Sequence, residues 1–180
     1  MEYTIRENLF IEKSSKIKLI CMDVDGVLTD GGIYIDQEGN QNLRFDVKDG
    51  LGIKILQKYN FIIALISGGE AKAINKRAEM LDINLIKTKV KNKFIALKGL
   101  QKDLNLTKDE TVFLGDDIND LSVLPLVSMF LVPENAHKAC IKEAFWIGKN
   151  SGGDGFVREF TDKFLLARGI NPLKAFISLN

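Results

Sequence analysis

The sequence predicts an α/β protein, a Rossmann-like three-layer sandwich in which helices cover both faces of a parallel sheet. Short apolar runs alternate along the chain with longer stretches of helical periodicity, as in βαβ units. Two of the apolar runs end in acidic residues, at positions 23–25 and 116–120. Because parallel strands end at the same edge of a sheet, we expect both acidic segments to meet there.

The expected core elements follow from their patterns. Continuous apolar runs bounded by glycine or polar residues predict strands at 18–22, 61–66, 84–87, 111–114 and 129–132. The stretches between and after these strands predict helices at 51–59, 70–81, 94–104, 136–144 and 156–167. A short helix or arm at 2–16 precedes the first strand.

An insertion separates the first strand from the first core helix. Segments 31–36 and 41–47 alternate apolar and polar residues and flank a polar turn, which predicts a β-hairpin over 31–47. The tail 168–180 retains apolar residues and is expected to pack on the rest of the protein.

Size and composition narrow the class of protein. A chain of 180 residues with 46% hydrophobic content suits one domain spanning 1–180. The net charge of +1 argues against nucleic-acid and membrane partners. Two cysteines, Cys21 and Cys140, fit buried positions of a reduced protein. With no membrane-length apolar run and a charged first segment, we expect a soluble, cytoplasmic protein.

The first acidic segment carries Asp23 and Asp25 just past the end of a strand, with Gly26 allowing the chain to turn away. Both carboxylates can face one pocket, and Thr29 and Asp30 supply further oxygen atoms. Taken alone, the motif fits equally well an acidic turn without chemistry.

Two further motifs can bind an anion. Ser67, Gly68 and Gly69 follow a strand and precede a helix, where free backbone N–H groups suit a phosphate, although an ordinary glycine turn explains them as well. Lys93 begins a helix, where the dipole disfavours a cation, so the lysine has reason to face an anion.

The second acidic segment, with Asp116, Asp117 and Asp120, follows the strand at 111–114. Several carboxylates at one sheet edge repel one another unless a cation binds. Hard oxygen ligands of this kind suit Mg²⁺, which prefers carboxylates together with substrate phosphate.

In order, these four motifs resemble those of haloacid dehalogenase-like (HAD) phosphatases. The hairpin in place of a cap domain, with segments 47–52 and 152–159, is similar to the capless branch. That branch contains 3-deoxy-D-manno-octulosonate 8-phosphate phosphatases, phosphatases for nine-carbon sialic-type sugar-acid phosphates, and noncatalytic domains of some cytidylyltransferases. The resemblance therefore implies a HAD core and hydrolysis of a sugar-acid phosphate, most simply the octulosonate ester of lipopolysaccharide precursor synthesis.

The resemblance also implies roles for the acidic residues. Asp23 would be the nucleophile that forms an aspartyl phosphate, and Asp25 the general acid and base. Asp23, the backbone carbonyl of Asp25 and Asp116 would hold Mg²⁺. Asp117 and Asp120 would lie beside these ligands and orient metal-bound water or Lys93.

For the substrate, the resemblance implies that Ser67, Gly68, Lys93 and Lys48 bind it, with Lys93 neutralising the phosphoryl group. Gly69 departs from the pattern, because the octulosonate branch usually has arginine there and the nine-carbon branch often glutamate. The only histidine, His137, lies near a helix start and fits a structural role better than a catalytic one.

Two other classes fit some of these features. A receiver-like phosphoaspartate protein lacks a counterpart of Asp25, and a noncatalytic HAD-like oligomerisation domain would not need Asp23, Asp25 and Lys93 together. The hairpin positions Ile33, Ile35, Leu43, Phe45 and Val47 would expose an apolar face on a monomer. With the resemblance, this face implies a homotetramer whose neighbours cover each pocket, unless the hairpin folds back on its own core.

Overall fold

The computed structural model describes the backbone of residues 2–177 and the side chains of residues 5–177. Its centre is a six-stranded parallel sheet in the order β5-β4-β1-β6-β7-β8. The strands are β1 (Leu19–Met22), β4 (Ile62–Ile66), β5 (Leu85–Lys87), β6 (Thr111–Leu114), β7 (Met129–Val132) and β8 (Trp146–Ile147). The α/β class and the five predicted core strands are confirmed, and β8 adds a strand at one edge.

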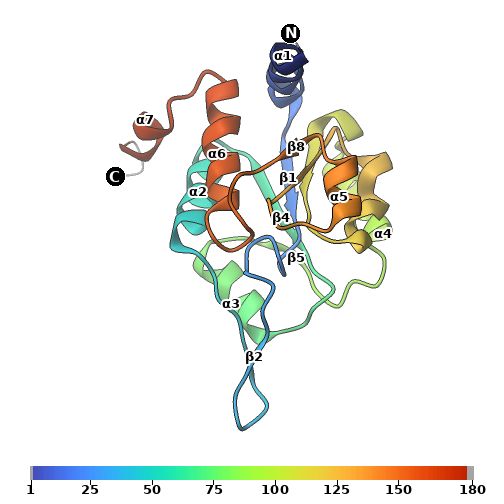
Figure 1. Cartoon of the computed structure of the whole chain (residues 1–180), viewed down its shortest axis with the longest axis vertical. Coiled ribbons are helices and arrows are strands. Elements are labelled where there is room, and N and C mark those ends of the chain that lie inside the picture. Colours follow the sequence, from blue (N-terminus) through green and yellow to red (C-terminus); the bar gives the residue numbers. More distant parts are fainter. Residues whose placement is uncertain (1, 178–180) are drawn as a thin grey trace.

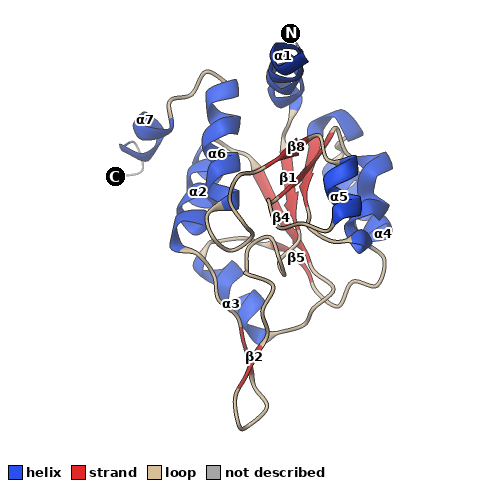
Figure 2. Ribbon diagram, viewed as in Figure 1, coloured by secondary structure: helices blue, strands red, loops and turns tan. Residues whose placement is uncertain are grey.

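Helices cover both faces of the sheet, as Figures 1 and 2 show. They are α1 (Glu2–Lys16), α2 (Val47–Lys58), α3 (Lys72–Met80), α4 (Lys93–Leu104), α5 (Lys138–Glu143), α6 (Phe156–Ala167) and α7 (Pro172–Ile177). Two 3-10 helices, η1 (Lys108–Glu110) and η2 (Ile118–Leu126), complete the set. The sequence predicted neither of them.

The alternation of side chains along β1 explains the two cores. Ile20 and Met22 point into a core shared with α2, α3 and α6, whereas Leu19 and Cys21 point into one shared with α4 and α5. All four side chains are buried, so β1 is apolar on both faces. Cys21 and Cys140 are both buried and free, as predicted.

The strand order reverses direction at β1, and this reversal locates the crevice. The chain passes from β1 outward to β4 and β5, then returns to β6 on the other side of β1. Met22 pairs with Leu114 in register, and the Asp23 N–H donates to the Leu114 carbonyl at 2.9 Å. The residues that follow β1 and β6 therefore leave the sheet side by side, where open α/β sheets bind ligands.

Helices α2 and α6 approach closely because small residues face the contact. A Cβ added to Gly52 would lie 2.8 Å from the Thr161 hydroxyl oxygen, which leaves no room for a side chain. The buried carboxylate of Asp49 accepts a hydrogen bond from the Arg158 N–H at 2.8 Å in the first turn of α6. Burial raises the pKa of Asp49 to about 6.

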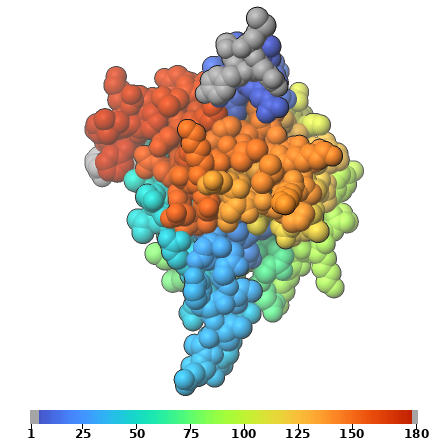
Figure 3. Space-filling view, viewed as in Figure 1, coloured from blue at the N-terminus to red at the C-terminus, as the bar shows by residue number. Residues whose placement is uncertain are grey.

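The predicted hairpin is present, but its ladder is short. Strands β2 (Tyr34–Ile35) and β3 (Gln41–Asn42) pair antiparallel, and the hairpin projects from the body in Figures 1 and 3. Its apolar residues do not form one exposed face, which corrects the expectation. Leu43 and Phe45 pack against the core, whereas Ile33 and Ile35 are 61% and 67% exposed.

The ends of several helices differ from prediction through capping. Helix α2 begins at Val47, about one turn before the predicted start at Leu51, because the Asp46 side chain accepts a hydrogen bond from the Lys48 N–H. His137 is the N-cap of α5 and accepts from the Ala139 N–H, which confirms a structural position for it.

The tail packs through part of its length. Helix α7 buries Ala175, and Ile170 lies against the core, while Leu173 and Ile177 are exposed. Residues 178–180 of the predicted tail lie outside the described residues. Within the part of the chain that the structure describes, no helix is both long and apolar enough to cross a membrane.

Candidate active site

A hollow of about 380 Å³ lies at the carboxyl ends of β1, β4 and β6. Its walls contain both predicted acidic segments and the glycines that follow β4. The lining residues are Asp23, Asp25, Gly26, Gly31, Gly68, Gly69, Asp116, Asp117 and Asn119. The sequence motifs thus converge on one pocket, and Asn119 and Gly31 are lining residues that the sequence did not single out.

A buried ion-pair network forms the floor of this site. The Lys93 ammonium lies 2.8 Å from Asp23 Oδ2 and 2.6 Å from Asp120 Oδ1, with the three residues only 3%, 5% and 0% exposed. Burial by itself would lower the pKa of Lys93, but the two carboxylates together raise that pKa. Lys93 therefore stays a cation and holds Asp23 in place.

Lys93 reaches this position because α4 begins there. The Asn92 side chain accepts a hydrogen bond from the Ile95 N–H at 3.0 Å, which caps the helix one residue before Lys93. The lysine side chain then points toward the end of β1 rather than into solvent. The sequence predicted that a lysine at this helix start faces an anion, and the carboxylates of Asp23 and Asp120 are the anions that it faces.

Asp120 organises the second acidic segment. Its Oδ1 accepts from Lys93, and its Oδ2 accepts from the backbone N–H groups of Asp116 and Asp117, at 2.9 and 3.3 Å. Asp117 instead accepts from the Ile118 N–H at 2.7 Å and caps η2. Of the two residues predicted to support the metal ligands, Asp120 contacts Lys93, whereas the side chain of Asp117 accepts from the backbone.

The donor set fits a hard divalent cation. Carboxylate oxygens of Asp23, Asp116 and Asp120 lie within 4.8 Å of one another. Oδ1 of Asp23 and Oδ1 of Asp116 are buried without a hydrogen-bond partner, which is costly unless a ligand satisfies them. Because both oxygens of Asp120 are already occupied, Asp23 and Asp116 remain as the carboxylates free to hold Mg²⁺.

The electrostatics of the site agree with this assignment. Burial, followed by repulsion from Asp120, raises the pKa of Asp23 to about 7. Burial, followed by repulsion from Asp23 and Asp120, raises the pKa of Asp116 to about 8. A bound cation would reverse both shifts, because it favours the ionised carboxylates.

Asp25 lies across the pocket from this network and turns toward the loop after β4. The Ser67 hydroxyl donates to Asp25 Oδ2 at 3.3 Å and accepts from the Gly69 N–H at 2.9 Å. Ser67 is fully buried, whereas Asp25 is partly exposed to the pocket. The predicted acid–base carboxylate and the predicted phosphate-binding hydroxyl are therefore neighbours.

Other predicted oxygen donors face away from the pocket. The buried Thr29 hydroxyl accepts from the N–H groups of Gly26 and Gly31, both at 3.2 Å, and so shapes the loop. Asp30 binds the Gly32 N–H and the Tyr34 hydroxyl at the base of the hairpin. The expectation that Thr29 and Asp30 supply oxygens to the pocket is wrong, because loop geometry uses both.

Lys48, which was expected to bind substrate, is outside the lining of the pocket. Its ammonium lies 3.6 Å from Asp46 Oδ2 on the exposed first turn of α2. In this arrangement the side chain does not reach the acidic cluster.

Glycines allow three loops to come together. Gly26 has φ +84°, and a Cβ there would lie 2.1 Å from Asp116 Oδ2. A Cβ on Gly152 would lie 1.7 Å from the Gly26 carbonyl oxygen, so the segment 151–155 packs directly on the backbone after β1. The Gly153 N–H donates to the Val27 carbonyl at 3.0 Å and fixes this contact.

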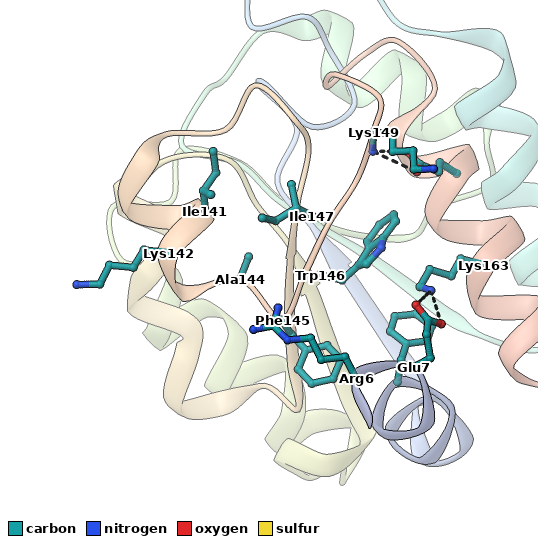
Figure 4. A pocket seen from close by; sticks show the side chains of 12 residues that line it. Arg6, Glu7, Ile141, Lys142, Ala144, Phe145, Trp146, Ile147, Lys149 and Lys163 are labelled. Atoms are coloured by element: carbon teal, nitrogen blue, oxygen red, sulfur yellow. Dashed lines mark hydrogen bonds and ion pairs between the residues drawn. The ribbon is translucent and has the colours of Figure 1, made fainter. Parts of the chain in front are cut away.

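A separate hollow of about 580 Å³ lies between α1, α5, β8 and α6 (Figure 4). Aromatic and basic side chains line it, including Trp146 and Lys163. Its carboxylates are engaged locally, since Glu7 binds Lys163 at 2.7 Å and Glu159 accepts from the Lys149 N–H. It has no cluster comparable to the one around Asp23.

Comparisons with known proteins agree with the geometry. A family model described as haloacid dehalogenase-like hydrolase matches residues 33–160. The 3-deoxy-D-manno-octulosonate 8-phosphate phosphatase KdsC of Escherichia coli K12 is 35% identical over 159 residues, which cover 88% of this chain and 85% of that protein.

Solved structures resemble the whole architecture. A 3-deoxy-D-manno-octulosonate 8-phosphate phosphatase from Moraxella catarrhalis, in complex with a magnesium ion, a phosphate ion and KDO, superposes with a TM-score of 0.89 at 34% identity. The match covers 96% of this chain and 98% of that one. The Yersinia pestis phosphatase of the same name gives 0.87 at 32% identity, covering 90% and 88%.

The raised pKa values predict that Mg²⁺ binds less tightly at lower pH. At pH 6 the carboxyl groups of Asp23 and Asp116, with pKa values of about 7 and 8, hold protons that the cation must displace. Each such proton weakens the apparent affinity about tenfold per pH unit below that pKa. The Mg²⁺-induced rise in unfolding temperature should therefore be larger at pH 8 than at pH 6.

Differential scanning fluorimetry with and without Mg²⁺ measures this difference, and Asp116→Asn is the control. The variant should show a small Mg²⁺ effect at both pH values, because it lacks one of the two free carboxylates. Equal stabilisation of the unmodified protein at both pH values would contradict the assignment of the ligands.

Proposed function

Because the chain belongs to the haloacid dehalogenase-like hydrolase family and is a phosphatase by its relatives, we propose that it hydrolyses 3-deoxy-D-manno-octulosonate 8-phosphate, in lipopolysaccharide precursor synthesis. The observation that carries the chemistry is the buried contact of Lys93 with Asp23 beside the unpartnered oxygen of Asp116. The choice of sugar acid rests on the relatives, since Gly69 matches neither substrate branch that the sequence resembles.

In the proposed reaction, a carboxylate oxygen of Asp23 attacks phosphorus and the bond to the sugar oxygen breaks. Asp25 gives its proton to that oxygen, and the phosphoryl group remains on Asp23 as an acyl phosphate. Asp25 then takes a proton from water, which attacks phosphorus and releases inorganic phosphate and the Asp23 carboxylate. Asp25 thus gives one proton to the sugar oxygen in the first half of the cycle and regains one from water in the second half.

Charge neutralisation makes this attack possible. An anionic carboxylate and a phosphate dianion repel each other, and Lys93 lies 2.8 Å from Asp23 to offset that repulsion. Asp23, Asp116 and the backbone carbonyl of Asp25 would hold Mg²⁺, which would supply further positive charge to offset this repulsion. The Ser67 hydroxyl and the Gly68 N–H would bind the remaining phosphoryl oxygens, while the Gly69 N–H holds the hydroxyl oxygen of Ser67.

The intact set of groups favours an enzyme over a noncatalytic oligomerisation domain. Such a domain would need neither a buried lysine nor unpartnered carboxylate oxygens, both of which are costly to bury without a use. Removing Lys93 would leave the buried carboxylates of Asp23 and Asp120 without their cation, at a cost of about 3–5 kcal/mol. Buried charged groups that are costly for the fold are therefore better explained by catalysis than by oligomerisation alone.

The test of function is phosphate release from a panel of phosphate esters. The octulosonate 8-phosphate should be hydrolysed with a higher kcat/KM than nine-carbon sugar-acid 9-phosphates or glucose 6-phosphate, in the presence of Mg²⁺ and not in EDTA. Asp23→Asn keeps the shape but removes the nucleophile, so turnover should fall by about 10³-fold or more.

A preference for a nine-carbon ester would replace the octulosonate assignment with the second sugar-acid class. Full activity in EDTA, or in Asp23→Asn, would sink the proposed chemistry. Circular dichroism of the variant distinguishes lost chemistry from lost folding.

We further propose that the protein works as a homotetramer in the cytoplasm. The pocket lies at the sheet edge, and Gly31, just before the hairpin strands, is part of its lining. The hairpin projects from the body (Figure 3), and its residues Ile33 and Ile35 are exposed. Pairing of hairpins between copies would bury these side chains and cover the open strands, and a neighbour could then exclude water from the pocket. The free, buried Cys21 and Cys140 suit a reducing compartment.

Sedimentation velocity at assay concentration tests the assembly. Ile35→Lys should give smaller species with reduced turnover, because it places a charge in the proposed interface. Met80→Lys, at a site that is 61% exposed against 67% for Ile35, is the matched control and should stay assembled. A fully active monomer would refute the shared pocket.

A further inference from the structure

We propose that the missing side chain at Gly69 leaves room for a resting position of Asp25. In this position the Asp25 carboxylate accepts the hydrogen bond of the Ser67 hydroxyl, so that phosphate binds only after Asp25 moves away. Gly69 acts here as a positioning residue, through Asp25 rather than by touching substrate. The inference deepens the proposed function and rests on it for the roles of Asp25 and Ser67.

The hydroxyl of Ser67 has a single proton to donate, and Asp25 receives it. Ser67 Oγ lies 3.3 Å from Asp25 Oδ2, and it accepts a hydrogen bond from the Gly69 N–H at 2.9 Å. A phosphoryl oxygen also needs a donor. Ser67 can therefore serve a phosphate only when Asp25 releases it, and the Asp25 carboxylate would repel the incoming anion from the same position.

The space for this resting position exists because residue 69 has no side chain. A Cβ at Gly69 would lie 2.9 Å from Asp25 Oδ2 and 3.3 Å from Ser67 Oγ. A Cβ at the neighbouring Gly68 would meet only the Val90 carbonyl, at an ordinary 3.7 Å. The crowding is thus specific to position 69 and directed at the end of the Asp25 side chain.

The loop itself is held from behind, so a methyl group at position 69 would displace Asp25 rather than the backbone. The Lys89 N–H donates to the Gly69 carbonyl at 2.9 Å, and the Val90 N–H donates to the Ser67 carbonyl at 3.0 Å. An ion pair between Glu70 and Lys89 joins the same two segments. The partly exposed carboxylate of Asp25 is the group that is free to move.

The consequence is a population shift. Phosphate binds only to the fraction of molecules in which Asp25 has left Ser67, and the apparent dissociation constant is raised by the reciprocal of that fraction. Gly69→Ala excludes the resting position and frees the hydroxyl. It should therefore tighten phosphate binding about three- to tenfold, as expected if the resting position holds between two thirds and nine tenths of the molecules.

A double-mutant cycle tests this with inorganic phosphate as the probe, titrated by calorimetry in the presence of Mg²⁺. Gly69→Ala should bind phosphate more tightly than the unmodified protein. In an Asp25→Ala background, the same Gly69→Ala change should leave the dissociation constant unchanged, because no carboxylate remains to displace. Gly69→Ser, which carries the same Cβ, is a second variant should alanine disturb folding.

Gly99→Ala is the control for a glycine replacement as such, since a Cβ at Gly99 in α4 meets nothing within 4 Å. It should leave phosphate binding unchanged. The inference is overturned if Gly69→Ala leaves affinity the same or weakens it, or if its effect is equal with and without Asp25. Because phosphate binding needs no turnover, failure of this cycle is distinguishable from failure to hydrolyse the sugar-acid ester.

Discussion

The mutual repulsion of three carboxylates, two buried and one half-buried, is the constraint on which the site depends, and Lys93 is the cation that offsets it. Asp23, Asp116 and Asp120 lie at one sheet edge with ligand oxygens within 4.8 Å of one another. Lys93 contacts Asp23 and Asp120, and the second carboxylate oxygen of Asp120 accepts a hydrogen bond from the backbone after β6. Asp23 and Asp116 each keep one carboxylate oxygen without a hydrogen-bond partner, and the pKa values of both groups are raised. A divalent cation would bind these two oxygens.

Close backbone contacts hold this charged group in register. The loop after β1 contacts Asp116 through Gly26 and contacts the segment 151–155 through the Gly26 carbonyl, and both contacts exclude a Cβ. The Thr29 hydroxyl joins two N–H groups of the same loop. Backbone contacts thus fix the loop that carries Asp23 and Asp25, which suits a reaction that depends on positioning.

The sequence predicted those parts of the site that follow from the order of the strands, and failed for those that depend on the conformation of a loop or on contacts with distant segments. Asp23 and Asp116 could be brought together because both follow strands of one parallel sheet. The direction of Thr29 could not be predicted, because it depends on the loop's own backbone geometry. The role of Gly152 and the burial of Phe45 depend on contacts with distant segments, which no local pattern encodes.

The central claim, that Asp23 carries the phosphoryl group, is tested most directly by trapping the acyl phosphate. Borohydride reduces an acyl phosphate of aspartate to homoserine, which peptide mass spectrometry locates to a residue. The unmodified enzyme quenched during turnover of its sugar-acid ester should carry homoserine at position 23. Reduction at Asp25 or Asp116, or turnover with no reduced aspartate, would contradict the account.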